Sequence, residues 1–154
     1  MNQIQDFKKI RKDGKIIDES MTAGNMVALG WSPEKVISIN WLSNNLPTTW
    51  QSPQGVLAIV IPGRNFLAAI EDLDDTGMHS RLSIIDPNGG MHLSIPNCQI
   101  INGMRMIGKF RWFEPTSPIV PDNFGVIFEV DRGATYKLDI SAPDARVVNV
   151  SLVR

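Results

Sequence analysis

Two histidines, His79 and His92, are the first candidates for acid–base chemistry in this chain. Histidine is the commonest general base because its side chain changes charge near neutral pH. His92 alternates with Met91 and Leu93, so in a strand its ring points away from theirs and toward solvent. His79 falls in a polar loop. Neither histidine belongs to a histidine–glutamate zinc motif or a nucleophile elbow, so we expect no catalytic residue and no metal site.

Cys98 is the single cysteine of the chain. One cysteine excludes a disulfide framework and a cysteine-rich zinc site, and such a residue usually behaves as a small buried hydrophobe. The glycine pair Gly89-Gly90 lacks a following lysine and is typical of a hairpin turn, not of a phosphate-binding loop. We therefore expect no cofactor.

The densest charge cluster spans residues 71–75 and contains four carboxylates: Glu71, Asp72, Asp74 and Asp75. It lacks the alternating ligands and the final glutamate of a calcium loop, which disfavours a metal site. A solvated loop between strands is the simplest interpretation. The functional alternative is a docking site for a basic partner, whose lysines and arginines these carboxylates would attract and pair with.

Four tryptophans are many for a chain of this length. Large aromatic side chains dominate protein cores and also anchor interfaces. We expect more of the tryptophans in the core than on the surface. Trp41 and Trp50 lie on either side of the polar stretch 43–49, and we expect Trp50 to be the most exposed. Trp112 should point opposite to Arg111 and Phe113 if the strand is regular. The fourth is Trp31.

These side chains must be positioned by short strands, because apolar runs alternate with proline- and glycine-rich turns along most of the chain. The clearest runs cover residues 36–41, 55–61, 66–70, 81–85, 91–95, 104–113, 124–130, 136–140 and 147–153. The run 55–61 is almost continuously apolar, which is typical of a strand covered on both faces. Residues 4–17 fit either a short amphipathic helix or a hairpin turning at Asp13-Gly14, and we favour the hairpin.

An internal repeat relates residues 66–97 to residues 124–153. Each segment begins with a phenylalanine, an apolar run and a glutamate, then continues through a charged loop, an alternating strand and a proline turn. Such units resemble propeller blades, but two blades cannot close a ring. We therefore predict an all-β fold in one domain, residues 1–154, with two antiparallel blade-like meanders packed as a half-propeller or a β-sandwich.

Composition limits the functional classes. The 154 residues carry a formal net charge of −1, which argues against a nucleic-acid coat or a polybasic membrane module. With 43% hydrophobic residues the chain can form a core, and no apolar stretch approaches the roughly 20 residues of a membrane helix. We expect a cytoplasmic protein.

The paired meanders over residues 31–154 resemble the small β-rich immunity proteins of bacterial contact-dependent growth inhibition and related polymorphic-toxin systems. The resemblance is architectural, with no signature motif. It implies a non-enzymatic antitoxin, monomeric when free, that binds one cognate toxin, often a nuclease, and blocks its active site. The carboxylates of residues 71–75 would then face a basic cleft of the toxin, with Trp50 as an apolar anchor.

Two other functions remain open at this stage. One is a small hydrolase-type enzyme with His79 or His92 as its base. The other is a carbohydrate- or peptide-binding module that uses exposed tryptophans.

Overall fold

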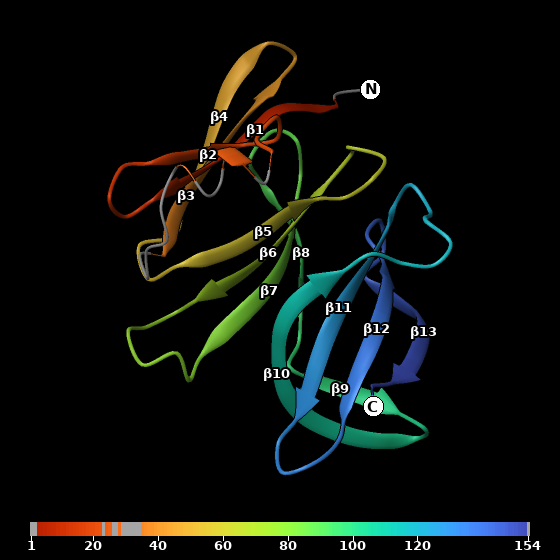
Figure 1. The fold of residues 1–154 in the computed structure, drawn as a ribbon. Coiled ribbons are helices and arrows are strands. Elements are labelled where there is room, and N and C mark those ends of the chain that lie inside the picture. The colour runs from red at the N-terminus through yellow and green to blue at the C-terminus, as the bar shows by residue number, and fades with distance from the viewer. Residues whose placement is uncertain (1–2, 23, 26–27, 29–34, 154) are drawn as a thin grey trace.

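The computed structural model describes residues 3–22, 24–25, 28 and 35–153, and its ribbon forms three antiparallel sheets (Figure 1). The all-β prediction is confirmed. The strands of the described residues are β1 (Ile4–Arg11), β2 (Ile16–Asp18), β3 (Val36–Ser43), β4 (Leu46–Gln51), β5 (Val56–Val60), β6 (Leu67–Asp72), β7 (Ser80–Ile85), β8 (Met91–Ile95), β9 (Cys98–Ile101), β10 (Met104–Glu114), β11 (Asn123–Val130), β12 (Thr135–Ser141) and β13 (Arg146–Leu152). In this part of the chain no helix is long and apolar enough to cross a membrane.

The N-terminal sheet has the strand order β2-β1-β3-β4. The predicted hairpin is confirmed: β1 pairs with β2 in the register Ile10↔Ile16, and Gly14 takes a positive φ of 85° in the turn. A left-handed backbone costs glycine little because it has no Cβ. The alternative of a helix over this segment is wrong.

The middle sheet, in the order β5-β6-β7-β8, is covered on both faces. Along β6, Leu67 and Ala69 join a core shared with the N-terminal sheet, whereas Ala68 and Ile70 join a core shared with the C-terminal sheet. Successive side chains of a strand point to opposite faces, so a strand covered on both sides must be apolar at every position. This arrangement explains the continuous apolar runs.

The C-terminal sheet has the order β13-β12-β11-β10-β9. Its long strand β10 arcs around the sheet, so that the sheet curves like half of a barrel (Figure 1). Phe110, Phe124 and Phe128 fill the inside of this curve and pack against the middle sheet. The end of β10 is thereby brought beside the edge of the middle sheet.

The number of sheets differs from the two meanders expected from the sequence. Residues 66–97 and 124–153 each contain a three-stranded meander, β6–β8 and β11–β13, and these lie in different sheets. The additional sheet comes from residues 4–51, whose mixed polar and apolar sequence did not indicate four paired strands. The result is a stack of three sheets with two cores.

Candidate functional site

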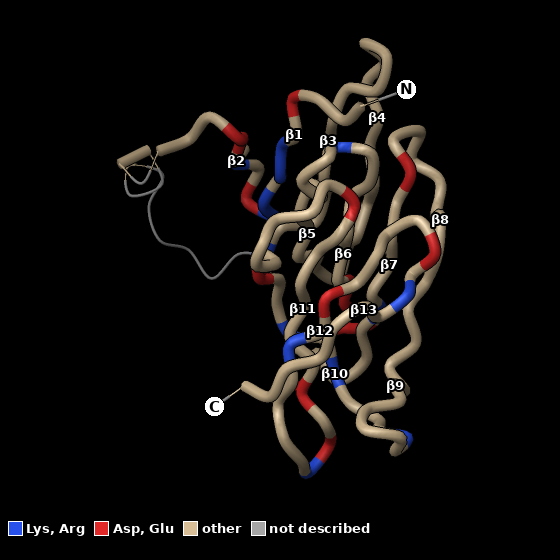
Figure 2. The backbone as a smooth tube through the Cα atoms, turned by 90° about the vertical axis from the view of Figure 1, so that its right-hand side faces the viewer, with Lys and Arg blue, Asp and Glu red and all other residues tan. Residues whose placement is uncertain are grey.

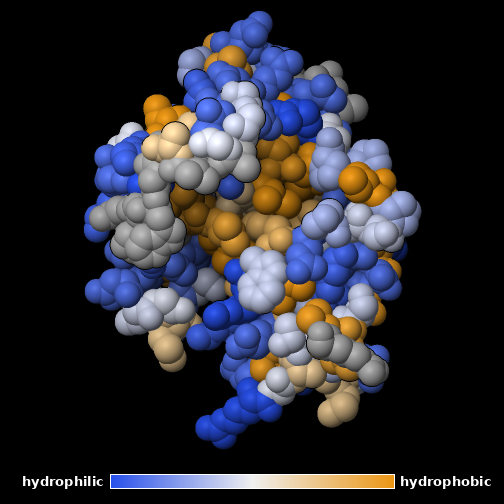
Figure 3. Space-filling model, viewed as in Figure 1, coloured by the Kyte–Doolittle hydropathy of each residue, from blue (hydrophilic) through white to orange (hydrophobic). Residues whose placement is uncertain are grey.

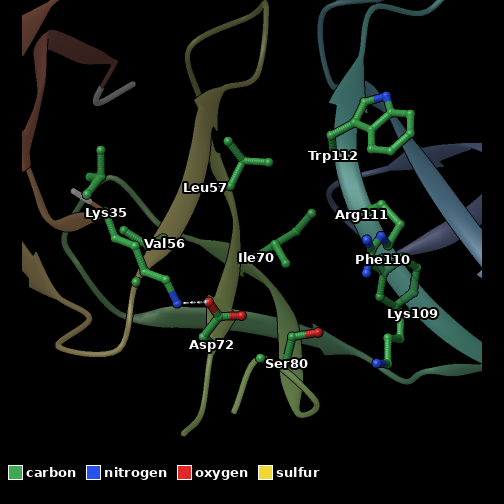
Figure 4. Close-up of a pocket in the computed structure, with 13 residues that line it drawn as sticks. Lys35, Val56, Leu57, Ile70, Asp72, Ser80, Lys109, Phe110, Arg111 and Trp112 are labelled. Atoms are coloured by element: carbon green, nitrogen blue, oxygen red, sulfur yellow. Dashed lines mark hydrogen bonds and ion pairs between the residues drawn. The ribbon is translucent and has the colours of Figure 1, made fainter. Parts of the chain in front are cut away.

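A cavity of about 420 Å³ opens between β5 and β10, where the middle sheet meets the C-terminal sheet. Its apolar lining comes from Val36, Val56, Leu57, Ile70, Phe110 and Trp112, and its charged lining from Lys35, Asp72, Lys109 and Arg111. Each wall carries both kinds of residue: Lys35, Leu57 and Asp72 face the space from one side, and the β10 residues 109–112 face it from the other (Figure 4). On the surface, the same view of the molecule shows an apolar hollow bordered by hydrophilic residues (Figure 3). We call this cavity the β5–β10 groove.

The β10 side of the groove is shaped by a β-bulge. Phe110 pairs with Phe128 of β11, but Phe113 pairs with Val126, so two residues of β10 oppose one residue of β11. The extra residue breaks the alternation of side chains, and Arg111 and Trp112 both line the groove. The prediction that Trp112 points opposite to both neighbours is wrong for Arg111, because it assumed a regular strand. It holds for Phe113, which packs against the core while Trp112 is exposed.

Trp112 is the most exposed tryptophan of the described residues, at 46%. Its indole Nε1 donates a hydrogen bond to Oε1 of Glu114 at 3.1 Å, which orients the ring beside the groove. Leu57, on the opposite wall, is 41% exposed. A large aromatic side chain opposite an exposed aliphatic one provides an apolar contact surface for a partner.

The groove continues along β5 into a second cavity of about 250 Å³. Ile59 and Val60 of β5, Phe113 of β10 and Ile119 of the following loop lie in its wall. Within the part of the chain that the structure describes, strand β5 pairs only with β6 and so forms an edge of the middle sheet. An open strand edge beside an apolar hollow is a common place for a protein partner to dock.

One end of the β5–β10 groove is fixed by an ion pair. The ammonium Nζ of Lys35 lies 3.0 Å from Oδ2 of Asp72 and also donates to the carbonyl of Gln54. The chain of Lys35 passes over Gly55, whose φ of +116° no other residue adopts readily. A Cβ at this glycine would lie 2.8 Å from Cδ of Lys35, so glycine is needed to keep the pair in place.

The four predicted carboxylates do not form one solvated loop. Glu71 is buried at 5% exposure and accepts hydrogen bonds from Ser52 Oγ at 2.6 Å and Trp50 Nε1 at 3.0 Å. Arg81 also donates to its second oxygen at 3.2 Å. Glu71 thus joins three elements inside the protein, and a partner cannot reach it. It was predicted as a docking residue because residues 71–72 were assigned to a loop, whereas they belong to β6.

Asp74 and Asp75 lie in the loop after β6, which borders the groove through Gly77. Asp74 accepts a hydrogen bond from Thr76 Oγ1 at 2.6 Å and lies 2.7 Å from Nδ1 of His79. The Thr76 hydrogen bond, followed by the contact with His79, lowers the pKa of Asp74 below its ordinary value. Asp75 is exposed. These two carboxylates are the part of the acidic run that a partner can contact.

His92 does not point freely into solvent, as the sequence suggested. It is the extra residue where β8 shifts register against β7. Its ring packs 5.0 Å from that of Phe66, and its Nε2 lies 2.8 Å from the carbonyl oxygen of Pro143 in the C-terminal sheet. His92 therefore links the middle sheet to the turn between β12 and β13 of the C-terminal sheet.

Trp50 is half-buried instead of being the most exposed tryptophan. Its indole packs against the core between the N-terminal and middle sheets, and its N–H is bound by Glu71. Trp41 is almost fully buried, at 1% exposure. Trp31 lies outside the described residues. The expectation for Trp50 is corrected because β4 carries it onto the core-facing side of the sheet.

The structure offers little for cofactor or metal chemistry among the described residues, where no cluster of three histidines, cysteines or carboxylates is found. Cys98 is half-exposed and not buried as expected, and Nε of Arg105 lies 2.9 Å from its Sγ. Basic and acidic residues are interspersed along the chain, not gathered in a single block (Figure 2).

The comparisons with known proteins point to one solved structure. No family model matches the chain, and the search of curated proteins gives no match. The chain is similar to a chain in the structure of Tne2 in complex with Tni2, with 36% sequence identity and a TM-score of 0.91. The alignment covers 98% of this chain and 99% of the other. This chain belongs to the same family as the matched chain of the Tne2–Tni2 complex.

The amino-acid pattern alone did not predict the β5–β10 groove. The groove depends on the bulge at Arg111 and Trp112 and on the open edge of β5, which only the three-dimensional packing reveals. One signal was present: an arginine and a tryptophan are adjacent in a long alternating segment. Both residue types are enriched where proteins bind one another most tightly.

Proposed function

We propose that this protein is an immunity protein that binds a cognate toxin and blocks the active site of that toxin. The observation that carries the proposal is its 36% identity, over nearly the whole chain, to a protein solved in a complex. Tne2 and Tni2 are a toxin–immunity pair, and the open β5–β10 groove, together with the lack of any group of three metal-ligating side chains among the described residues, fits the inhibitory member of such a pair.

The mechanism is steric occlusion by a preformed surface. Trp112 and Leu57 supply exposed apolar area, and most of the energy of an interface comes from a few such residues at its centre. The predicted carboxylates Asp74 and Asp75 lie in the loop that borders the groove, within reach of a basic part of the toxin, whereas Asp72 is paired with Lys35 inside the groove. The free protein is a cytoplasmic monomer in this proposal, which sets no limit on the catalytic class of the toxin and includes nucleases.

The proposal is tested with the protein encoded by the gene immediately upstream of this one. Both proteins are purified, and their association is measured by isothermal titration calorimetry and size-exclusion chromatography. We expect a one-to-one complex of nanomolar affinity. We also expect that bacteria producing the upstream protein survive only when this protein is co-produced. Lack of a complex, or killing that co-production does not relieve, contradicts the proposal.

One observation favours an enzyme as the second candidate. The imidazole of His79 contacts the carboxylate of Asp74, as in a general base oriented by an acid. The side chain of His79 is 72% exposed on a loop, however, and lies outside the β5–β10 groove. A hydrolase activity against generic ester, glycoside or phosphate substrates that vanishes in His79→Ala would establish this alternative in place of the first.

A further inference from the structure

We infer that the β5–β10 groove receives a segment of the toxin that carries a carboxylate next to an apolar side chain. This inference rests on the proposed function and specifies the chemistry of the partner segment. The sequence led us to expect contacts through acidic residues of this protein, whereas in the groove we infer contacts through basic residues of this protein. Two observations support this inference: basic residues outnumber acidic residues in the lining of the groove, and two of the basic residues lie beside Trp112 (Figure 4).

The charged lining is basic overall. Three cations and one carboxylate line the groove, and the carboxylate of Asp72 is already paired with Lys35. The remaining cations, Lys109 and Arg111, both belong to β10. The ammonium of Lys109 has no ion-pair partner among the described residues. Two cations of the groove are therefore available to an incoming anion.

The only neighbouring carboxylate that competes for these cations, within the part of the chain that is described, is Glu129 of β11. Its Oε2 lies 3.9 Å from Nε of Arg111, and its backbone pairs with that of Lys109. Both side chains of the Arg111–Glu129 pair are about half exposed, at 45% and 52%. Such a long, solvated pair contributes little energy, so Arg111 can exchange Glu129 for a carboxylate of a partner.

The apolar part of the groove indicates that the partner segment also carries an apolar side chain. Trp112 and Leu57 leave an apolar surface open between the two walls, and Ile70 and Phe110 form part of the lining. An apolar side chain of the partner that enters here removes this surface from water and excludes solvent around the two cations. Exclusion of water strengthens the attraction between these cations and a carboxylate. The occupant that satisfies both features is an apolar residue adjacent to Asp or Glu.

The test compares two double charge reversals in the full-length protein. K109E/R111E reverses both groove cations, and K12E/R146E reverses two exposed cations that do not line the groove, one in the β1–β2 turn and one at the start of β13. The two variants have the same change of net charge. Binding to the upstream toxin is measured by calorimetry at low and high salt, and folding is checked by thermal melting. We expect K109E/R111E to bind at least about 100-fold more weakly and K12E/R146E to bind within about 3-fold of the wild type.

A second arm identifies the carboxylate. Each exposed Asp and Glu of the toxin is changed to Lys, and we expect one of these variants to restore binding to K109E/R111E at least about 10-fold. Wild-type affinity in K109E/R111E overturns the inference and leaves the immunity function intact. Equal weakening in both double variants also overturns it, because a general charge effect then explains the loss. If the wild-type protein forms no complex, the proposed function itself fails.

Discussion

At the scale of single residues, Trp112 is the side chain on which binding should depend most. It is 46% exposed, its indole is held by Glu114, and it does not belong to either core. We expect Trp112→Ala to melt within about 3 °C of the wild type, since surface changes cost little stability. Affinity for the toxin should fall about 30-fold or more, which is the effect of losing an interface hot spot.

The matched control for Trp112 is Trp50→Ala. Trp50 packs on a core and binds Glu71, so its removal should lower the melting temperature clearly. Calorimetry of binding together with thermal melting separates the two effects. Unchanged affinity in Trp112→Ala would remove this residue from the interface.

Glu71 illustrates the opposite role within the same acidic run. Its carboxylate accepts hydrogen bonds from Ser52, Trp50 and Arg81 while almost fully buried. In Glu71→Ala these donors lose their acceptor inside the protein, and we expect the free energy of unfolding to fall by about 3 kcal/mol. Urea unfolding at neutral pH measures this change.

The control for Glu71 is the exposed residue Asp75 of the following loop. Asp75→Ala should change the free energy of unfolding by less than about 0.5 kcal/mol, as is usual for exposed side chains. Equal effects of the two substitutions would contradict the structural role of Glu71.

At the scale of elements, an arginine–carboxylate pair ties the N-terminal sheet to the middle sheet. Arg64, in the turn between β5 and β6, binds both oxygens of Glu19 at 2.8 and 2.9 Å, and its Nε donates to the carbonyl of Ile4 in β1. The side-chain hydrogen bonds from Arg64 are the main cause that lowers the pKa of Glu19 below its ordinary value. The pair should therefore stabilise the junction in a pH-dependent way.

The sign of the pH effect follows from the lowered pKa. The stabilisation is complete above the pKa of Glu19 in the unfolded chain, roughly 4.3, and is lost as pH falls through the lower folded value. Both side chains are more than a third exposed, so we expect a contribution of only about 1 kcal/mol. Denaturation between pH 6 and pH 3 should show a smaller loss of stability in Glu19→Gln than in the wild type. Identical pH profiles would show that the pair contributes nothing.

Some of the strands could be predicted from the sequence and others could not. The strands of the middle and C-terminal sheets were predictable because their apolar runs are long and end at prolines and glycines. For the N-terminal sheet the sequence indicated the β1–β2 hairpin and a strand at residues 36–41, but not their assembly into four strands, because β1 buries only two apolar residues, Ile4 and Phe7, and the four other residues from Gln5 to Lys9 are polar or charged. A strand is recognised in a sequence by the apolar residues at its buried positions, so a strand with few buried positions is difficult to recognise.

The candidate groove was less predictable than the fold. The alternation of side chains along a regular strand predicts that Arg111 and Trp112 lie on opposite faces. Both line the groove because of the bulge, which arises from the pairing between β10 and β11 and is not visible in the sequence of β10. Likewise, the acidic run looked like one loop, although β6 extends through Asp72 and buries Glu71 between two sheets. Both errors arise where pairing across the sheet overrides the local pattern.

At the scale of the whole molecule, the middle sheet is shared by both cores, and this predicts that the chain unfolds in one step. Ile84 and Ile85 are neighbours on β7 and both have 0% exposure, but Ile84 belongs to the core with the C-terminal sheet and Ile85 to the core with the N-terminal sheet. A cavity at either position weakens the sheet on which both outer sheets depend. We therefore expect Ile84→Ala and Ile85→Ala each to cost about 3 kcal/mol.

The decisive observation is the shape of the unfolding transition. In a Trp31→Phe/Trp112→Phe background, tryptophan fluorescence reports on the N-terminal sheet through Trp41 and Trp50, while circular dichroism reports on all strands. If residues 1–154 form one cooperative domain, the two signals give a single coincident transition in the wild type, and each variant moves it as a whole. If the N-terminal sheet folds separately, Ile85→Ala shifts the fluorescence transition away from the circular-dichroism transition, and Ile84→Ala does not. A shared middle sheet leaves no boundary at which such a separation could begin, because the side chains of every strand in it contribute to at least one of the two cores.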